Sequence, residues 1–289
     1  MPGMHVGTQY FATDEKSMQF LQRFGVKNLD ALVPDMEIDT LRGVMEASAK
    51  FGIATDLVHL PALKPGDTGG CPSSIKLAQD PERDADIALF CRAIENAGAV
   101  GLRGICWHFC VLENQRSPDT PGRGGSATSS LYAADYDNET LCEAAVLNGG
   151  YVTRDEVFAR MKYLLERIVP VAERCKVQLC CHLSDPPAPV LRGVERWDWP
   201  VVEGINRFLG LYDSPYHGMN LCCGTASEGM DNPAVELLPM VKDLAERNKI
   251  FNIHYRNING GLMNFQVPTS QRALDIYIPE NTLVRLVLL

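Results

Sequence analysis

The chain has 289 residues, of which 46% are hydrophobic and 22% charged, and its formal net charge is −9. This length fits one large α/β domain or two smaller ones, and the composition is typical of a globular protein with a sizeable core. The negative charge argues against general binding of nucleic acid or of anionic membranes, because both require basic patches. We see no secretory signal and no apolar run long enough to span a bilayer. The ten cysteines therefore indicate reduced thiols and a cytoplasmic protein.

The first half of the chain repeats one pattern, in which an amphipathic helix is followed by a glycine and then by a short apolar strand. Glycine directly after a helix commonly adopts the left-handed conformation that ends it. The predicted helices cover residues 14–24, 40–51 and 83–97, and the glycines that follow them are Gly25, Gly52 and Gly98.

The second half continues the pattern with stronger helix-start signals. Thr153 lies three residues before Glu156 and predicts a capping box at the start of a long helix. Asn232 and Pro233 predict an N-cap and a first helical turn further along. Each of these helices leads into an apolar strand, "VQLCCHL" in the first case and "IFNIHYRNI" in the second.

Seven strands are expected in this alternation, which predicts parallel βαβ units. The last three start 42 and 31 residues apart (219 − 177 and 250 − 219), which we compare with the roughly 31 residues per unit of a (β/α)₈ TIM barrel. A doubly wound sheet is the alternative, but no G-x-G-x-x-G motif follows an early strand. After the seventh strand there is room for one short helix or strand, which leaves the last unit incomplete and closure of the barrel in doubt. The predicted strands start at about residues 4, 28, 53, 101, 177, 219 and 250.

We therefore expect a single TIM-barrel domain over residues 1–289, with one long loop. The loop covers about residues 113–152 and is rich in glycine, serine, proline and aspartate. Loops of this length in compact domains are usually functional or disordered. We expect it to be an active-site loop, with a flexible tether as the alternative.

Three potential metal ligands end successive strands near the carboxyl end of the chain. His182, Cys222 and His254 are separated by 40 and 32 residues (222 − 182 and 254 − 222). Active sites of TIM barrels lie at the carboxyl ends of the strands, so these side chains can converge on one divalent metal. The alternative is that each is structural, as a hydrogen-bonded histidine or a packed cysteine. Arg256 shares a strand face with His254 and can bind a carboxylate ligand, or it pairs with a structural acid such as Asp185.

The stretches "HLSDPP", "CCGTASEG" and "IHYRNINGG" resemble motifs of the mannonate dehydratase family, whose members are barrels of the xylose-isomerase-like type. The resemblance implies a metal centre of His182, Cys222 and His254, with Asp275 in "LDIY" as a fourth ligand. It implies Mn²⁺ as the metal, with Fe²⁺, Co²⁺ or Mg²⁺ as alternatives. Cys222 is chosen over its neighbour because the family's ligand precedes the Gly-Thr pair by two positions.

The resemblance extends to "RSPDTPGRGG" in the long loop and implies substrate binding by Arg116, Arg123 and Gly124. Two departures lie near the end of the chain: "GLMNFQVPTSQRA" is short of the acids expected there, and the family's final strand and helix are not present in the sequence. These departures make turnover less certain than metal binding.

The activity that the resemblance implies is that of a hydro-lyase of hexuronate catabolism, which converts D-mannonate to 2-keto-3-deoxy-D-gluconate and water. Arg256 and Arg123 are candidates for binding the carboxylate. His108 is a candidate proton donor, with a buried structural histidine as the alternative. Asp185 is a candidate base, or it caps its loop or orients His182.

Two other functions remain open from the sequence. One is a xylose-isomerase-like sugar isomerase or epimerase, and the other is a catalytically impaired homologue that binds metal and sugar acids. For either function we expect a small-molecule partner, no nucleic acid, no membrane, and a homo-oligomer (dimer or tetramer).

Overall fold

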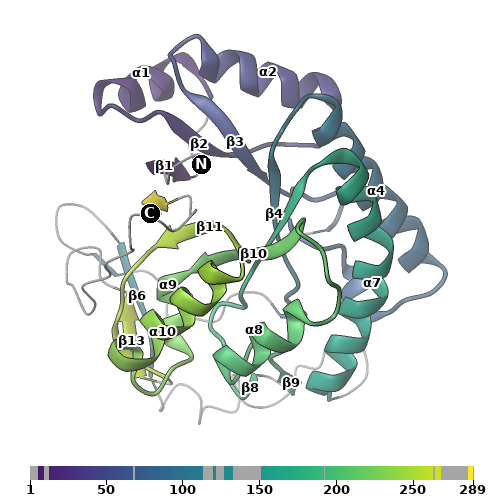
Figure 1. The fold of residues 1–289 in the computed structure, drawn as a ribbon, viewed down its shortest axis with the longest axis vertical. Helices are drawn as coiled ribbons and strands as arrows, with labels where there is room; N and C mark the ends of the chain where they lie inside the picture. Colours follow the sequence, from purple (N-terminus) through teal and green to yellow (C-terminus); the bar gives the residue numbers. More distant parts are fainter. Residues whose placement is uncertain are drawn as a thin grey trace.

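The computed structural model describes residues 6–9, 13–67, 69–112, 120–121, 127–132, 151–191, 193–262, 264–267 and 286–288. Within these ranges, parallel strands and covering helices alternate along the chain, as the sequence pattern predicts (Figure 1).

The strands form a closed barrel whose order around the ring is β1-β14-β11-β10-β7-β4-β3-β2. Every neighbouring pair in the ring is parallel, so all carboxyl ends open at one mouth. The prediction of a (β/α)₈ barrel is confirmed. The strands are β1 (Val6–Gln9), β2 (Asn28–Leu32), β3 (Ala54–His59), β4 (Gly104–His108), β7 (Gln178–His182), β10 (His217–Cys222), β11 (Ile250–Tyr255) and β14 (Leu286–Leu288).

The ring is closed by β14, a strand of three residues. Leu286 is the register partner both of Ile253 in β11 and of Val6 in β1, so the first and last barrel strands lie side by side (Figure 1). The sequence analysis left closure of the barrel open, and this short strand closes it.

The helices cover the outside of the barrel (Figure 1). The capping box of α7 is present, because Thr153 Oγ1 accepts the backbone N–H of Glu156 at 3.2 Å and the Glu156 carboxylate accepts that of Thr153 at 2.8 Å. The helices are α1 (Glu15–Arg23), α2 (Ile38–Ala49), α3 (Ser73–Leu77), α4 (Glu82–Ala99), α7 (Arg154–Cys175), α8 (Val201–Leu209), α9 (Cys223–Glu228) and α10 (Pro233–Glu246).

One helix end differs from the prediction. Gly25 and Gly52 follow their helices with positive φ angles, as expected, but Gly98 lies inside α4, and Gly101 takes the left-handed conformation instead. A β-carbon at position 98 would lie 2.8 Å from Cys175 Cβ of α7. The glycine therefore permits the close packing of α4 on α7 and does not end the helix.

A second, antiparallel sheet joins two loops that leave carboxyl ends of the barrel strands. It has the order β12-β13-β6-β5, and β6 lies in the long loop after β4, whereas β13 follows β11 (Figure 1). Part of the loop expected at 113–152 is thus β-structure. The strands are β5 (Thr120–Pro121), β6 (Ala127–Tyr132), β12 (Asn259–Gly261) and β13 (Asn264–Val267), and a separate hairpin pairs β8 (Val190–Leu191) with β9 (Val194–Glu195).

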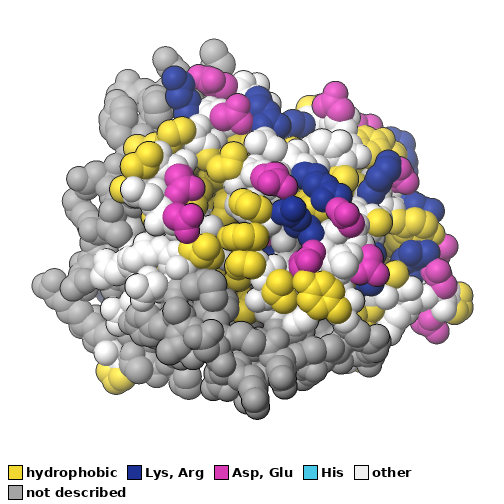
Figure 2. Space-filling model, turned by 90° about the horizontal axis from the view of Figure 1, so that it is seen from below, with side chains coloured by type: hydrophobic (Ala, Val, Ile, Leu, Met, Phe, Trp, Pro, Cys, Tyr) yellow, Lys and Arg dark blue, Asp and Glu magenta, His cyan; other side chains and the backbone are white. Residues whose placement is uncertain are grey.

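The main core lies between the barrel and its helices. Trp107 packs edge-on against Phe90 at a centroid distance of 5.8 Å, and Trp197 lies 5.1 Å from Phe208. A smaller apolar cluster of Leu57, Cys106, Cys180 and Phe251 comes from four barrel strands. On the face drawn in Figure 2, basic and acidic side chains are interspersed with apolar ones. Among the described helices, none combines the length and apolar character needed to cross a bilayer.

We predict opposite effects of alanine at two helical glycines. Gly98→Ala should lower the free energy of unfolding by about 1–3 kcal/mol, because the new methyl group overlaps Cys175. Gly43→Ala in α2 should raise it by up to about 1 kcal/mol, because that position is open and alanine favours the helix. Urea unfolding of both variants measures the difference, and equal effects would contradict the packing role of Gly98.

Candidate metal centre

Three side chains from neighbouring strands meet at the mouth of the barrel. His182 ends β7, Cys222 ends β10 and His254 lies in β11. One potential ligand atom of each lies within 4.8 Å of the others. The register explains the meeting, because Cys222 is the partner of His254 and Asn220 is the partner of His182. Two imidazoles and one thiolate form a donor set that suits Zn²⁺, Fe²⁺ or Co²⁺, and also Mn²⁺.

His182 is fixed in the orientation that a metal ligand needs. Its Nδ1 lies 2.7 Å from the carbonyl oxygen of Leu183, which can only accept a hydrogen bond. Nδ1 therefore carries a proton, and Nε2 is the ring nitrogen that is available to bind a metal. Histidine residues that bind a metal commonly make such a hydrogen bond through the ring nitrogen that does not face the metal.

Cys222 is a thiolate in this setting. Burial alone would raise its pKa, but Arg256 and hydrogen bonds from His182 and His254 lower the pKa well below its usual value. Its Sγ also accepts the backbone N–H of Thr225 at 3.4 Å, because Cys222 is the N-cap of α9. For its neighbour Cys223, burial raises the thiol pKa. The structure thus places Cys222, and not Cys223, in the cluster.

His254 lies between two anionic groups. Burial favours the neutral ring, but Asp30 and the Cys222 thiolate together raise the pKa of His254 to about 9. Asp30 Oδ2 is 3.8 Å from His254 Nε2 and 3.0 Å from His59 Nε2. For Asp30, these histidines outweigh burial and hold the pKa well below its usual value. In the metal-free centre, the anionic Cys222 and Asp30 therefore lie on either side of the cationic His254.

Arg256 is paired with acids. Its Nη2 lies 2.7 Å from Glu228 Oε1, 2.6 Å from Thr225 Oγ1 and 3.4 Å from Asp185 Oδ1. Glu228 is fully buried. The pairing with Asp185 considered from the sequence is thus present, and Glu228 is a closer partner. Gly224 makes room for this arrangement, because a β-carbon there would lie 2.6 Å from Arg256 Nε.

A cavity of about 260 Å³ opens onto the cluster. His108, Asp185 and Arg256 line it together with the three potential ligands. The pKa of His108 is lowered to about 3, mainly because the side chain is buried and secondly because His182 lies nearby. His108 is therefore neutral and offers an N–H donor, not the charged imidazolium expected of a strong proton donor.

Four of the predicted site residues lie outside the described part of the chain. These are Arg116, Arg123 and Gly124 of the long loop and Asp275 near the end of the chain. Their roles stay predictions.

The sequence analysis missed Glu228, Asp30 and His59, which the structure places at the site. His59 ends β3 as His182 ends β7, so the same strand-end signal was present. Glu228 lies inside the quoted stretch "CCGTASEG". The buried aspartate in "NLDAL" was a further signal, because a charge within an apolar strand needs a partner.

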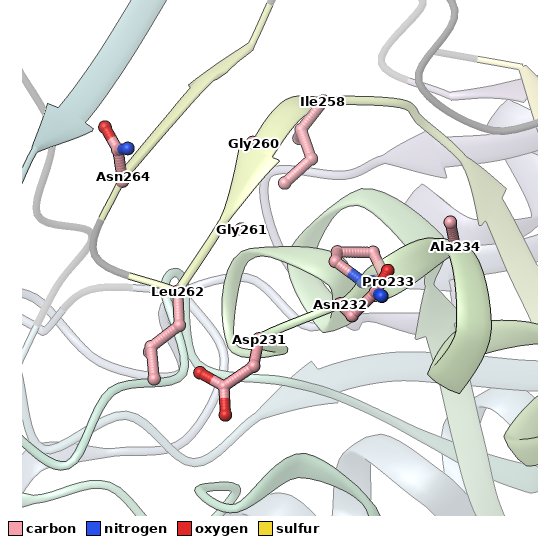
Figure 3. Close-up of a pocket in the computed structure, with 9 residues that line it drawn as sticks. All are labelled: Asp231, Asn232, Pro233, Ala234, Ile258, Gly260, Gly261, Leu262 and Asn264. Atoms are coloured by element: carbon pink, nitrogen blue, oxygen red, sulfur yellow. The ribbon is translucent and has the colours of Figure 1, made fainter.

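A second pocket, of about 430 Å³, lies between the start of α10 and the β12–β13 hairpin (Figure 3). Among the described residues that line it, Asp231 is the one with an ionisable side chain. Of the two pockets, the one at the barrel mouth therefore carries the chemistry.

The fold and the cluster define a parallel (β/α)₈ barrel with a candidate metal centre at its carboxyl-end mouth. The family model "D-mannonate dehydratase (UxuA)" matches residues 136–273. A mannonate dehydratase of Streptococcus suis (strain 05ZYH33) is 26% identical over 210 residues, which cover 64% of this chain and 55% of that protein. The chain thus spans just over half the length of this curated relative. The resemblance to the mannonate dehydratase family is confirmed.

Solved structures support the fold. The crystal structure of mannonate dehydratase from Streptococcus suis serotype 2 superposes with a TM-score of 0.77 at 22% identity, covering 95% of this chain and 80% of that one. A xylose isomerase domain protein from Planctomyces limnophilus gives a TM-score of 0.56 at 11% identity, with coverage of 99% and 91%. At these identities the likeness establishes the barrel architecture alone.

Metal affinity should depend on pH through His254. Because the pKa of His254 is about 9 in the metal-free protein, the metal must displace one proton at neutral pH, whereas the Cys222 thiolate releases none. The affinity should rise about tenfold per pH unit up to about pH 9 and then level off. Competition titrations with Zn²⁺ at several pH values measure this slope. His254→Asn should abolish it, and an unchanged slope in that variant would contradict the assignment.

The buried ion pair of Arg256 and Glu228 should matter for stability. Glu228→Gln leaves the arginine without its nearest anion and should lower the free energy of unfolding by about 3–5 kcal/mol. The matched control is Glu246→Gln, which breaks an exposed pair with Lys242 and should cost well under about 1 kcal/mol. Equal unfolding midpoints for the two variants would show that Glu228 does not anchor Arg256.

Proposed function

We propose that this chain is a metal-dependent hydro-lyase that dehydrates D-mannonate to 2-keto-3-deoxy-D-gluconate. The observation that carries the proposal is the meeting of His182, Cys222 and His254 in a chain that resembles the mannonate dehydratases. These three residues would hold the divalent cation, with Asp275 as a fourth ligand. The donor chemistry fits several metals, and Mn²⁺ is preferred because of the resemblance.

The reaction needs a proton to leave the carbon next to the carboxylate and a hydroxyl group to leave the carbon beyond it. A bound divalent cation supplies positive charge that stabilises the anion formed in the first event. The chain supplies the remaining functions from the walls of the cavity, where Arg256, His108 and Asp185 lie.

Arg256 is our candidate for the substrate carboxylate. Glu228 and Thr225 hold its Nη2 in place, so the guanidinium is presented to the cavity in a fixed orientation. A planar guanidinium matches the geometry of a carboxylate better than a lysine does. Arg116, Arg123 and Gly124 of the long loop would add contacts from above, and the pairing of β6 with β13 brings part of that loop to the mouth.

His108 and Asp185 differ in their suitability for the two proton transfers. The neutral His108 can donate an N–H hydrogen bond to the leaving hydroxyl. Asp185 accepts from Thr225 and Arg256 through Oδ1, which favours orientation of the loop over action as a strong base. The general base is therefore not assigned to either residue.

A sugar isomerase or epimerase is the less favoured function, because the matched family model is that of a dehydratase. The alternative of an impaired homologue, which binds sugar acids without turnover, is tested by the assay described below.

We further propose a single barrel domain, a cytoplasmic location, a homo-oligomeric state and a place in hexuronate catabolism. The location is supported by the need of the Cys222 thiolate for a reducing environment.

The decisive assay incubates the Mn²⁺-loaded protein with a panel of hexonates and measures 2-keto-3-deoxy acids. We expect product from D-mannonate, and Arg256→Lys should lower kcat/KM on the order of 10²-fold, because the ammonium group lacks the planar fork. Lys242→Arg on the exposed face of α10 is the control and should leave the rate unchanged. Appearance of an epimer or a ketose in place of the keto-deoxy acid would favour the isomerase alternative. Stabilisation by hexonates without product would identify the impaired homologue.

A further inference from the structure

A second group of potential metal ligands lies in the barrel, on the three strands that follow those of the first group around the ring. Asp30 of β2, His59 of β3 and Cys106 of β4 each offer one ligand atom within 4.8 Å of the others. His59 Nε2 is 3.0 Å and Cys106 Sγ is 3.8 Å from the same oxygen, Asp30 Oδ2. None of these residues has a role in the function proposed above.

The group is buried but reachable. Asp30 and Cys106 are 2% and 1% exposed, so water screens their charges poorly. His59 is half-buried and lines the cavity of about 260 Å³ together with Cys106. An ion that enters the cavity therefore meets both clusters.

Oxygen acceptors are in excess around this group. Asp30 Oδ1, Gln9 Oε1 and Asn252 Oδ1 are buried and have no hydrogen-bond partner among the described residues. Each belongs to a residue whose other polar atom contacts the group, because Gln9 Nε2 lies 2.9 Å from His59 Nε2 and Asn252 Nδ2 lies 3.5 Å from Asp30 Oδ2. Buried acceptors without donors are costly, and a cation satisfies several of them at once.

The hydrogen bonds of His59 also conflict. Its Nε2 faces both the Asp30 carboxylate, which can only accept, and the amide nitrogen of Gln9, which can only donate. One ring nitrogen carries either a proton or a lone pair, so it cannot serve both neighbours. Exchanging the oxygen and nitrogen atoms of the Gln9 amide would remove this conflict. The NH₂ group would then lie where the oxygen now has no hydrogen-bond partner. A cation bound by the His59 lone pair and the carboxylate resolves the conflict directly.

We propose that Asp30, His59 and Cys106 bind a second divalent cation beside the one assigned to His182, Cys222 and His254. An oxygen, a nitrogen and a sulfur ligand favour Zn²⁺, Co²⁺ or Fe²⁺ over Mg²⁺. Asp30 Oδ2 is 3.8 Å from His254 Nε2, so the two ions share one cavity. Two adjacent cations can hold two oxygen atoms of one substrate, which suits a polyhydroxy acid. The competing interpretation is an ion pair of Asp30 and His59 that orients His254, with water on the unpaired oxygens.

The test titrates the metal-free protein with Co²⁺ alone and counts bound ions. Each proposed site contains one thiolate, so each contributes its own sulfur-to-cobalt absorption band. We expect two ions per chain in the wild type. Cys106→Ala should lose one ion and about half of the band intensity, and Cys222→Ala should lose the other ion. The matched control is Cys180→Ala, which removes a buried thiol of the same interior cluster and should retain two ions.

The outcomes separate this inference from the proposed function. A single ion that is lost in Cys222→Ala and kept in Cys106→Ala would overturn the second site and leave the first intact. A single ion with the reverse dependence would support the second site and remove the metal centre on which the proposed function rests. Two ions that both persist in Cys106→Ala would also overturn the inference. Asp30→Asn, which keeps the side-chain shape, should lose the same ion as Cys106→Ala, and circular dichroism checks that each variant is folded.

Discussion

The centre of this protein depends on charge compensation, because water cannot screen the charges that are buried there. The Cys222 thiolate, Asp30 and Glu228 are buried anions, and each has a cationic neighbour within the barrel. Glu228 lies 2.7 Å from Arg256, and His254 lies between Asp30 and Cys222. Loss of any one of these anions would leave a buried cation with less compensating charge, which is more costly than breaking an ion pair at the surface.

Hydrogen bonds and ion pairs within the chain orient the side chains of the site. His182 is oriented by the Leu183 carbonyl, Cys222 by the first turn of α9, and Arg256 by Glu228 and Thr225. A ligand that binds here does not have to order these side chains, so little of the binding free energy is spent on organisation. In the function that we propose, this arrangement would favour groups that complete the charge pattern, namely a cation among the anions and a carboxylate near Arg256.

The parallel barrel converts regular spacing along the chain into contact in space. Ligands one βα unit apart become register partners or near partners on β7, β10 and β11. The two loops that leave β4 and β11 are tied together by the pairing of β6 with β13, which brings part of the long loop to the same mouth. The barrel thus places the three potential metal ligands and Arg256 at one mouth, as expected for a site built from strand ends.

The sequence by itself determined the barrel, the order of its units, the capping box of Thr153 and the strand-end set of His182, Cys222 and His254. These features are local or depend on one regular repeat, so periodicity and spacing are sufficient to find them. Tertiary structure alone decided that Asn252 meets Asp30 across 222 positions of the chain, that Glu228 anchors Arg256, and that Gly98 serves packing and not helix termination. The closure by β14 was likewise undecided, because a three-residue strand carries too little pattern to be recognised. Such contacts depend on which strands face each other across the barrel and on how closely two helices approach. The local sequence specifies neither.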